Sequence, residues 1–433
     1  MNPRVKQIFI LMSVLLLVAV TAIGCGNSGS ELPVGLVKSA LARDMTPESS
    51  DGDLEELVSG NTAFALDMYH QLQEEEGNLF FSPYSISLAL AMTYAGARGE
   101  TETQMSETLQ FTLSQEELHQ AFNALDIALA SRGENVEGQD GEPFRLNIAN
   151  SLWGQEDYEF LSDFLDVLAE NYGAGFNVLD FMTEPEEARG IINSWVEEQT
   201  EDKIKDILPE GSIHDLTRLV LTNAIYFNAA WAHEFEEDAT RDRPFHLPDG
   251  SQVTVSMMSQ AENFEYAEGD AYQAIEVPYD GEELSMVVIM PESGHFEEFE
   301  DSLDPEKLRS ILSRLAATEV AFSMPKFEYE SDSVSLASTL SDMGMPQAFS
   351  GAADFSGIDG TGQLFIKDVI HKAFISVNES GTEAAASTAV NMQLKGAPDI
   401  IATMIVDHPF IYLIRDIETG SVLFLGRMMN PGS

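Results

Sequence analysis

One segment near the carboxyl end constrains the fold more than any other, because its side chains alternate in kind from Thr382 to Leu394. Every second residue belongs to a set of small or apolar side chains, namely Thr382, Ala384, Ala386, Thr388, Val390, Met392 and Leu394. The residues between them are mostly small or polar, namely Glu383, Ala385, Ser387, Ala389, Asn391 and Gln393. A period of two is typical of a β-strand with one face suited to burial. Helix propensity alone would favour an Ala-rich helix for the first half, but the alternation continues and favours a strand. Because the first half is so small, we expect that it can slide between two existing strands.

The remainder of the chain carries helical patterns first and strand patterns later. Apolar residues at helical spacing from Leu54 to Leu72 predict a first amphipathic helix. Ser82 and Pro83 are typical of the start of a second helix, and Glu100 to Leu109 begins a third. Short β-type runs follow at 219–227, 285–290, 319–324, 365–377, 410–414 and 422–427. No repeat, heptad array or second linker divides this part of the sequence, so we expect one large α+β domain.

Composition excludes several classes of protein. Hydrophobic residues make up 44% of the 433 residues, which is enough for a large core and excludes global disorder. The formal net charge of −51 makes nucleic acid a poor partner, since the field of the whole molecule repels phosphate. We interpret this acidity mainly as a solvating surface. The chain has one cysteine, so it can form neither an intrachain disulfide nor a cluster of Cys ligands around a metal.

The amino terminus predicts export. Arg4 and Lys6 precede an apolar run from Ile8 to about Val20, and the run ends in small residues before Cys25. Such a run is too short for a spanning helix and is typical of a signal peptide, here residues 1–24. Small residues directly before a cysteine resemble the lipobox of bacterial lipoproteins. This resemblance implies that Cys25 carries a lipid and anchors the protein to the outer face of the membrane. The alternative is an ordinary secretory signal with an incidental cysteine.

Residues 25–53 are rich in Gly, Ser, Pro and acidic side chains, and we interpret them as a flexible tether. The acidic stretch from Asp51 to Glu55 lacks the glycine and the later glutamate of a calcium loop, so a solvated helix cap is the better interpretation. The folded domain is then expected to span residues 54–433.

Catalytic signatures are missing from the sequence. It contains no G-x-S-x-G, H-E-x-x-H, phosphate-binding P-loop or G-x-G-x-x-G motif, and no two histidines have the spacing of metal ligands. We therefore expect neither an enzyme nor a metal or cofactor site.

From Leu54 to Pro431 the chain resembles the serpin family of protease inhibitors. The motifs that carry the resemblance occur in the family's order, and they are Asn78-Leu79-Phe80-Phe81-Ser82-Pro83-Tyr84-Ser85-Ile86, Asn223-Ala224-Ile225-Tyr226-Phe227 with Trp231, His371-Lys372-Ala373-Phe374, the segment from Gly381 to Thr388, and Asp407-His408-Pro409-Phe410 leading to Gly426-Arg427. The resemblance implies about nine helices around three β-sheets, with an exposed reactive loop near the carboxyl end. It also implies a metastable, monomeric inhibitor that a serine protease cleaves and acylates, after which the loop inserts into the central sheet and traps the enzyme.

Site residues follow from the family's spacing. The resemblance implies a scissile bond at Lys395-Gly396, and a lysine there suits a trypsin-like protease. If the bond used lies one or two residues away, Leu394 or Met392 suits a chymotrypsin- or subtilisin-like protease instead. The hinge on which the loop inserts is implied to comprise Glu379, Gly381, Thr382, Glu383, Ala384, Ala385, Ala386, Ser387 and Thr388.

Two further groups are implied in the central sheet. Ser82, Ser85, Asn223 and His371 match the hydrogen-bonded cluster beneath the place where the strands part. Trp231, Lys326 and Glu379 match the top of the sheet, where insertion begins, and a Glu379–Lys326 ion pair there would pin the entry point. No basic helix suited to a polyanionic cofactor is evident.

Other functions remain open at this point. A non-inhibitory serpin acting as a carrier or a chaperone-like binder would tend to have bulky, charged or proline residues in the hinge, and here only Glu383 is charged. Inhibition of cysteine proteases is a further alternative, and an unrelated solute-binding lipoprotein is remote.

Overall fold

The computed structural model describes residues 35–74, 76–132, 145–382 and 401–432. All of them belong to one compact unit, Val34–Ser433. None of the helices in these ranges is both long and apolar enough to cross a membrane.

Ten α-helices lie within the described ranges, close to the nine that were expected. They are α1 Asp51–Leu72, α2 Pro83–Tyr94, α3 Gly99–Thr108, α4 Gln115–Ala130, α5 Ser162–Tyr172, α6 Pro185–Gln199, α7 Phe296–Asp301, α8 Pro305–Ser313, α9 Ala337–Met343 and α10 Ser356–Asp359, with short 3₁₀ turns η1 Glu237–Ala239 and η2 Pro346–Phe349. The acidic start of α1 is a helix cap, as the sequence indicated: the Ser50 side chain accepts from the backbone of Asp53, whose carboxylate accepts in return. Pro83 occupies the first turn of α2, and every residue of that helix is buried.

Six of the strands within the described ranges lie on the six predicted runs, and the others, apart from the start of the alternating segment at Thr382, were not predicted. They are β1 Gly35–Val37, β2 Leu79–Phe81, β3 Arg145–Gln155, β4 Phe176–Leu179, β5 Leu219–Ala230, β6 Arg241–His246, β7 Gln252–Gly269, β8 Tyr272–Pro278, β9 Leu284–Pro291, β10 Ala316–Pro325, β11 Phe327–Glu330, β12 Val334–Ser335, β13 Asp368–Val377, β14 Gly381–Thr382, β15 Ala402–Ile405, β16 Phe410–Asp416 and β17 Val422–Met428.

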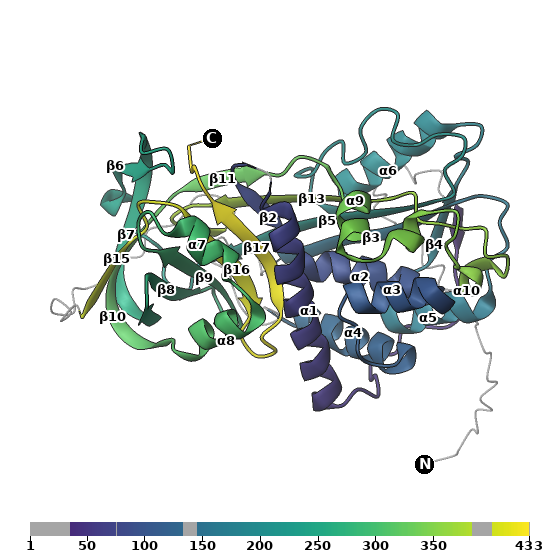
Figure 1. Cartoon of the computed structure of the whole chain (residues 1–433), viewed down its shortest axis with the longest axis horizontal. Helices are drawn as coiled ribbons and strands as arrows, with labels where there is room; N and C mark the ends of the chain where they lie inside the picture. Colours follow the sequence, from purple (N-terminus) through teal and green to yellow (C-terminus); the bar gives the residue numbers. More distant parts are fainter. Residues whose placement is uncertain (1–34, 75, 133–144, 383–400, 433) are drawn as a thin grey trace, which may run out of the picture. The chain divides into compact units, whose positions relative to one another are not determined.

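The central sheet has the order β1-β4-β3-β5-β14-β13-β11, with β12 also paired to β13. Helix α6 covers one of its faces, and α2 lies on the other (Figure 1). Alternate residues of β5 separate accordingly: Val220 and Ala224 pack with the α6 side, while Leu221 and Ile225 join the main core. Because both faces are covered, β5 is buried along its whole length.

The other described strands form a single sheet in the order β15-β10-β7-β8-β9-β16-β17-β2, with β6 paired to β7. Three sheets were expected, and the difference comes from β7. The first part of this long strand pairs with β6, its middle with β10 and its last residues with β8, so it joins regions that would otherwise count as two sheets.

Part of the expected tether is packed onto the folded body. Strand β1 pairs with β4 at the outer edge of the central sheet. Beyond it, Arg43 forms an ion pair of 2.6 Å with Asp126 of α4, and the Asn123 amide donates to the backbone of Asp44. The prediction of a flexible segment up to residue 53 therefore does not fit residues 35–46. Polar composition suggested a tether, but these residues find charged and backbone partners far away in the sequence.

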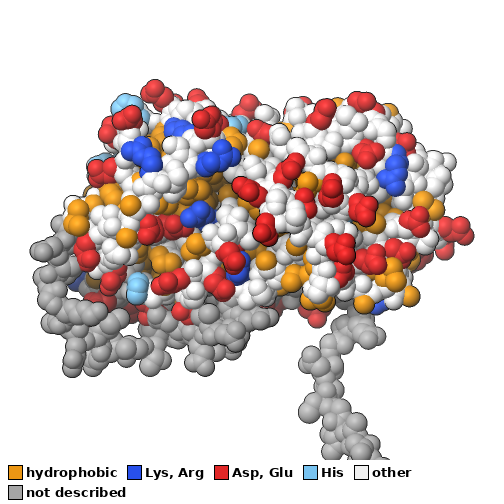
Figure 2. Space-filling view, turned by 90° about the horizontal axis from the view of Figure 1, so that it is seen from below, with side chains coloured by type: hydrophobic (Ala, Val, Ile, Leu, Met, Phe, Trp, Pro, Cys, Tyr) orange, Lys and Arg blue, Asp and Glu red, His pale blue; other side chains and the backbone are white. Residues whose placement is uncertain are grey.

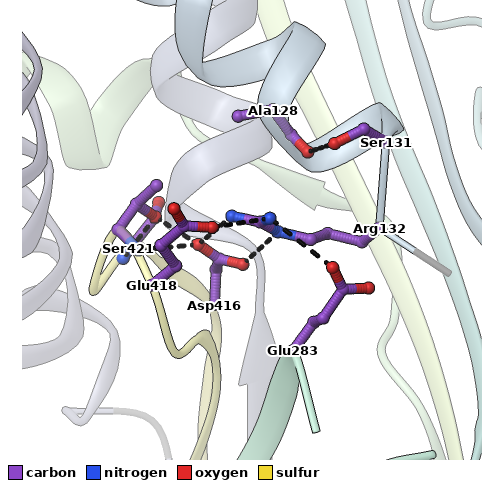
Figure 3. A network of polar contacts seen from close by, with 8 residues as sticks. Ala128, Ser131, Arg132, Glu283, Asp416, Glu418 and Ser421 are labelled. Atoms are coloured by element: carbon purple, nitrogen blue, oxygen red, sulfur yellow. Dashed lines mark hydrogen bonds and ion pairs between the residues drawn. The ribbon is translucent and has the colours of Figure 1, made fainter. Parts of the chain in front are cut away.

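A buried ionic network fixes the end of α4 (Figure 3). The Arg132 guanidinium donates two hydrogen bonds to the carboxylate of Asp416, which is fully buried. Glu418 and Glu283 lie 2.9 and 3.7 Å from the same side chain. A bidentate, desolvated pair of this kind is directional. It ties the end of α4 to the turns after β8 and β16.

Candidate functional site

The central sheet opens between β5 and β13. These two strands are parallel and pair directly from Asp368 with Val220 to Phe374 with Tyr226. Beyond Phe374 they separate, and the two residues of β14 lie between them. Gly381 and Thr382 pair antiparallel with Ala230 and Ala229 of β5, and Thr382 also pairs with Val377 of β13. The first residues of the predicted loop strand thus already occupy the opening.

Both residues of β14 fit this position closely. A side chain at Gly381 would place its Cβ 2.2 Å from the carbonyl oxygen of Ala229, so only glycine is compatible with this approach. Thr382 is completely buried, and its Oγ1 lies 2.8 Å from the hydroxyl of Tyr279. Burial of Tyr279 raises the pKa of its hydroxyl, so the phenol is neutral and can share a proton with Thr382.

Trp231 holds the chain just before β14. Its backbone N–H donates to the carbonyl of Ser380 at 2.9 Å, and its indole N–H donates to the carbonyl of Asn378. The indole stacks on Tyr279 with ring centroids 4.6 Å apart. Trp231 therefore contacts both the turn into β14 and the ring beneath it.

Glu379 anchors the same turn through its side chain. Its carboxylate lies 2.6 Å from Nζ of Lys326 and accepts from the Thr240 hydroxyl at 2.8 Å. Burial opposes ionisation, but the hydrogen bonds from Lys326 and Thr240 prevail and lower the pKa of the Glu379 carboxyl. The ion pair that the resemblance implied is therefore present in the structure.

A buried polar cluster lies deeper, beneath the closed part of the sheet. The hydroxyl of Ser82 donates to the carbonyl of Leu423 and accepts from the backbone N–H of Ser85. The Asn223 amide donates to the Ser85 hydroxyl at 2.7 Å. Asn150 completes the cluster, because its amide donates to the carbonyl of Ser85 and its oxygen accepts from the Ser85 and Asn223 side chains.

His371 closes the cluster and is neutral. The backbone N–H of Ser82 can only donate, so Nε2 of His371 is the acceptor. The imidazole proton consequently sits on Nδ1 and is donated to the side-chain oxygen of Asn223 at 2.5 Å. Burial lowers the pKa of His371 to about 3, against a weaker opposing effect of Asn223. This hydrogen bond links β5 to β13 at the place where they pair directly.

The structure therefore brings together Ser82, Ser85, Asn223 and His371 in one cluster, and Trp231, Lys326, Glu379 and Thr382 in another. The remaining predicted residues, Cys25, Glu383 to Thr388, Lys395 and Gly396, lie outside the described residues. Sequence reasoning missed Asn150, Thr240 and Tyr279. The one signal for Asn150 was a polar residue inside an apolar strand pattern, while Thr240 and Tyr279 gave none.

No group of His, Cys, Asp and Glu side chains within the described ranges is arranged to hold a metal ion. The arrangement suits a mechanical role, because its polar groups bond strands of the central sheet to one another and to the residues packed against them.

Comparison with known proteins gives a consistent result. The sequence profile of the serpin family, described as serine protease inhibitor, matches residues 59–431. A serpin-like protein of Thermococcus kodakarensis is 42% identical over 386 residues, covering 88% of this chain and 87% of the relative. Leukocyte elastase inhibitor of Homo sapiens is 41% identical over 391 residues, covering 87% and 100%. The solved structure of the thermophilic serpin tengpin in its native state superposes with a TM-score of 0.79 at 30% identity, covering 90% of this chain and 97% of that one. The chain therefore belongs to the serpin family.

Proposed function

We propose that this protein is a suicide-substrate inhibitor of serine endopeptidases, which it traps by inserting its reactive loop between β5 and β13. The observation that supports this proposal most strongly is β14, because Gly381 and Thr382 already pair with both strands at the opening. A loop that continued this pairing would become a full strand of the central sheet.

The register of β14 predicts where the inserted strand would lie. Six residues after Thr382 comes Thr388, and six residues before Ala229 and Val377 come Asn223 and His371. These two residues pair with each other in β5 and β13. Continued insertion would therefore bring Thr388 between them, on the same inner face as Thr382. The hydrogen bond between His371 and Asn223 would have to break, so this cluster would resist insertion until the loop arrives.

Insertion is favourable for a geometrical reason. Each parallel pairing of β5 with β13 would be replaced by two antiparallel pairings with the new strand, and antiparallel ladders are somewhat more stable per residue. With about 1 kcal/mol net for each added hydrogen bond, plus apolar burial, the gain is on the order of 10 kcal/mol. The native state would then be held by a kinetic barrier rather than by equilibrium.

In the proposed reaction, the protease serine attacks the carbonyl carbon of Lys395. The amide bond to Gly396 breaks, the new amino group leaves with the carboxyl-terminal fragment, and Lys395 stays on the enzyme as an ester. Insertion of the loop then carries the acylated enzyme away before water can hydrolyse that ester. The protein acts as a substrate whose turnover stops halfway.

The target class is inferred from Lys395. An ammonium group matches proteases whose primary pocket holds a carboxylate. The relatives named leukocyte elastase inhibitor support protease inhibition in general. Because of Lys395, we propose a trypsin-like protease as the target. If a neighbouring bond is cleaved, Leu394 or Met392 would occupy the primary pocket of the protease instead.

Substitution of Lys395 separates these possibilities. Lys395→Ala should slow inhibition of a trypsin-like protease at least about tenfold, which is about 1.4 kcal/mol of barrier, and leave an elastase-like protease inhibited no more slowly. Lys367→Ala, at an exposed lysine before β13, makes the same change of charge and should alter neither rate. If Lys395→Ala and the unaltered protein inhibited the trypsin-like protease at equal rates, the proposed scissile bond would be refuted.

We further propose that the inhibitor is exported and held at the outer face of the membrane by a lipid on Cys25. The support is the apolar run that ends in small residues directly before the chain's single cysteine. Such an anchor would place the inhibitor where secreted and environmental proteases act.

A further inference from the structure

A cavity of about 600 Å³ lies between α4 and α5, away from the central opening. Its walls also include Arg98, after α2, and Asp44, in the packed amino-terminal segment. Cavities of this size are typical of small-molecule sites. Nothing in the proposed inhibitory mechanism uses it.

His119 gives the cavity an unsatisfied polar group. The residue lines the cavity but is only 3% exposed, and its Nε2 has no hydrogen-bond partner. The hydroxyl of Tyr172 lies 2.6 Å from Nδ1. Burial lowers the pKa of His119 to about 4, so the ring is neutral and carries one proton.

The position of that proton depends on Tyr172. Its hydroxyl can donate to Nδ1 or accept from it, and in the tautomer where it donates, the imidazole proton lies on Nε2. His119 lines the cavity and Tyr172 does not, while Nε2 itself is fully buried in the wall. A buried N–H without an acceptor is unfavourable. A small shift of the side chains around His119 would let a ligand oxygen accept a hydrogen bond from this N–H.

Arg98 supplies a second group of donors. One of its terminal nitrogens donates to the carbonyls of Ala95 and Ala97, which fixes the guanidinium in place. Gly357 makes this position possible, because a Cβ there would lie 2.6 Å from the guanidinium carbon. Hydrogen bonds from Ser356 and, to a smaller extent, the charge of Arg98 lower the pKa of the Asp354 carboxyl, so one carboxylate of the protein already lies near this guanidinium. The other guanidinium nitrogens are the ones that a ligand carboxylate would use.

Negative charge dominates the rest of the wall. The lining contains four carboxylates, those of Asp44, Glu116, Asp163 and Glu170. On the face shown in Figure 2, acidic side chains predominate over the half of the molecule that carries α4 and α5 (Figure 1), whereas basic side chains gather on the other half. A simple anion would be repelled by these carboxylates, and a simple cation would leave the remaining N–H groups of Arg98 unused.

We propose that this cavity binds a small amphiphilic zwitterion, of which an α-amino acid or dipeptide with apolar side chains is the simplest kind. Its carboxylate would bind Arg98 and the N–H of His119, and its ammonium group would face the carboxylates. The apolar wall formed by Leu161, Phe164 and Val167 would hold its side chains. This site is independent of the proposed protease inhibition.

Isothermal titration calorimetry with three ligands of similar shape tests whether the purified chain binds a zwitterion. They are the dipeptide leucyl-leucine, its carboxyl-terminal amide and its N-acetyl derivative. The zwitterion should bind at least about tenfold more tightly than either analogue that carries a single charge. Equal binding of the amide or of the acetyl derivative would overturn the two-charge assignment, and lack of binding by all three at millimolar concentration would overturn the site.

Variants locate the binding. His119→Phe keeps an aromatic ring but lacks the N–H, and it should weaken leucyl-leucine about fivefold. If that variant folds poorly, the double variant Glu116→Gln/Glu170→Gln changes only exposed side chains and should also weaken binding. The control Glu107→Gln/Glu198→Gln makes the same change of charge outside the cavity and should have no effect. Unchanged affinity in the first double variant, or an equal loss in the control, would refute this location.

Discussion

The most informative perturbation of the proposed mechanism is Thr382→Arg. Thr382 is fully buried at the opening of the central sheet and bonds to the buried hydroxyl of Tyr279. Because Thr382 already occupies this site before insertion, an arginine there would be displaced from the opening and would have to be buried again for the inserted strand to form. Its guanidinium would have to be accommodated in the fully buried site beside Tyr279.

The size of the effect follows from the cost of burying that charge. An unpaired charge costs several kcal/mol even after the protein relaxes, and 3 kcal/mol would slow insertion about 150-fold. Insertion competes with hydrolysis of the acyl-enzyme, so such a delay would shift most molecules to the hydrolytic branch. The variant should be cleaved at the same bond as the unaltered protein but should form little covalent complex.

The assay is a titration of a trypsin-like protease, with the covalent complex read on a denaturing gel. Glu383→Arg is the matched control, since it places the same side chain one residue further along, on the set predicted to face outward. It should lower the yield of complex far less than Thr382→Arg. A yield for Thr382→Arg equal to that of the unaltered protein would refute insertion in this register.

Three further predictions concern metastability, anchoring and pH. Cleavage within the loop should raise the thermal midpoint well above that of the intact protein, and equal midpoints in calorimetry would argue against insertion. Cys25→Ala should release the protein from the membrane fraction or leave its signal uncleaved, whereas normal cleavage with unchanged partitioning would argue against the lipid. The folded-state pKa of His371 is about 3 against 6.5 as a free side chain. The unfolded chain therefore binds a proton below pH 6.5 that the folded chain does not, and stability falls by about 1.4 kcal/mol for each pH unit. In urea unfolding between pH 6.5 and 4, the free energy of unfolding of His371→Gln should fall less steeply as the pH is lowered, by the contribution of one proton. An unchanged slope would contradict the neutral, buried imidazole.

Much of the fold could be predicted because its signals are local. The Ser82-Pro83 start of α2 is a capping pattern within one turn, and β5 and β13 are continuous apolar runs of the kind that is buried on both faces. The motif order then placed Asn223 and His371 in one cluster, where the structure also has them.

Contacts between distant residues could not be predicted in this way. The Thr382–Tyr279 bond joins residues 103 positions apart, and no pattern around Tyr279 indicates a partner. Arg43 pairs with Asp126 over 83 positions, so the composition of the surrounding segment suggested a tether although part of it is packed. Even the number of sheets depended on how far β7 extends, which is set by pairing with β6, β10 and β8.

Mass spectrometry of the protein mixed with trypsin tests the central claim most directly. If the loop traps the enzyme, the mixture should contain one covalent complex, with the mass of the two proteins less a released fragment that begins at Gly396. A fragment that begins at Lys395 or Gln393 would move the reactive bond and point to a chymotrypsin- or subtilisin-like target. Quantitative cleavage without any covalent complex would contradict the inhibitory mechanism itself.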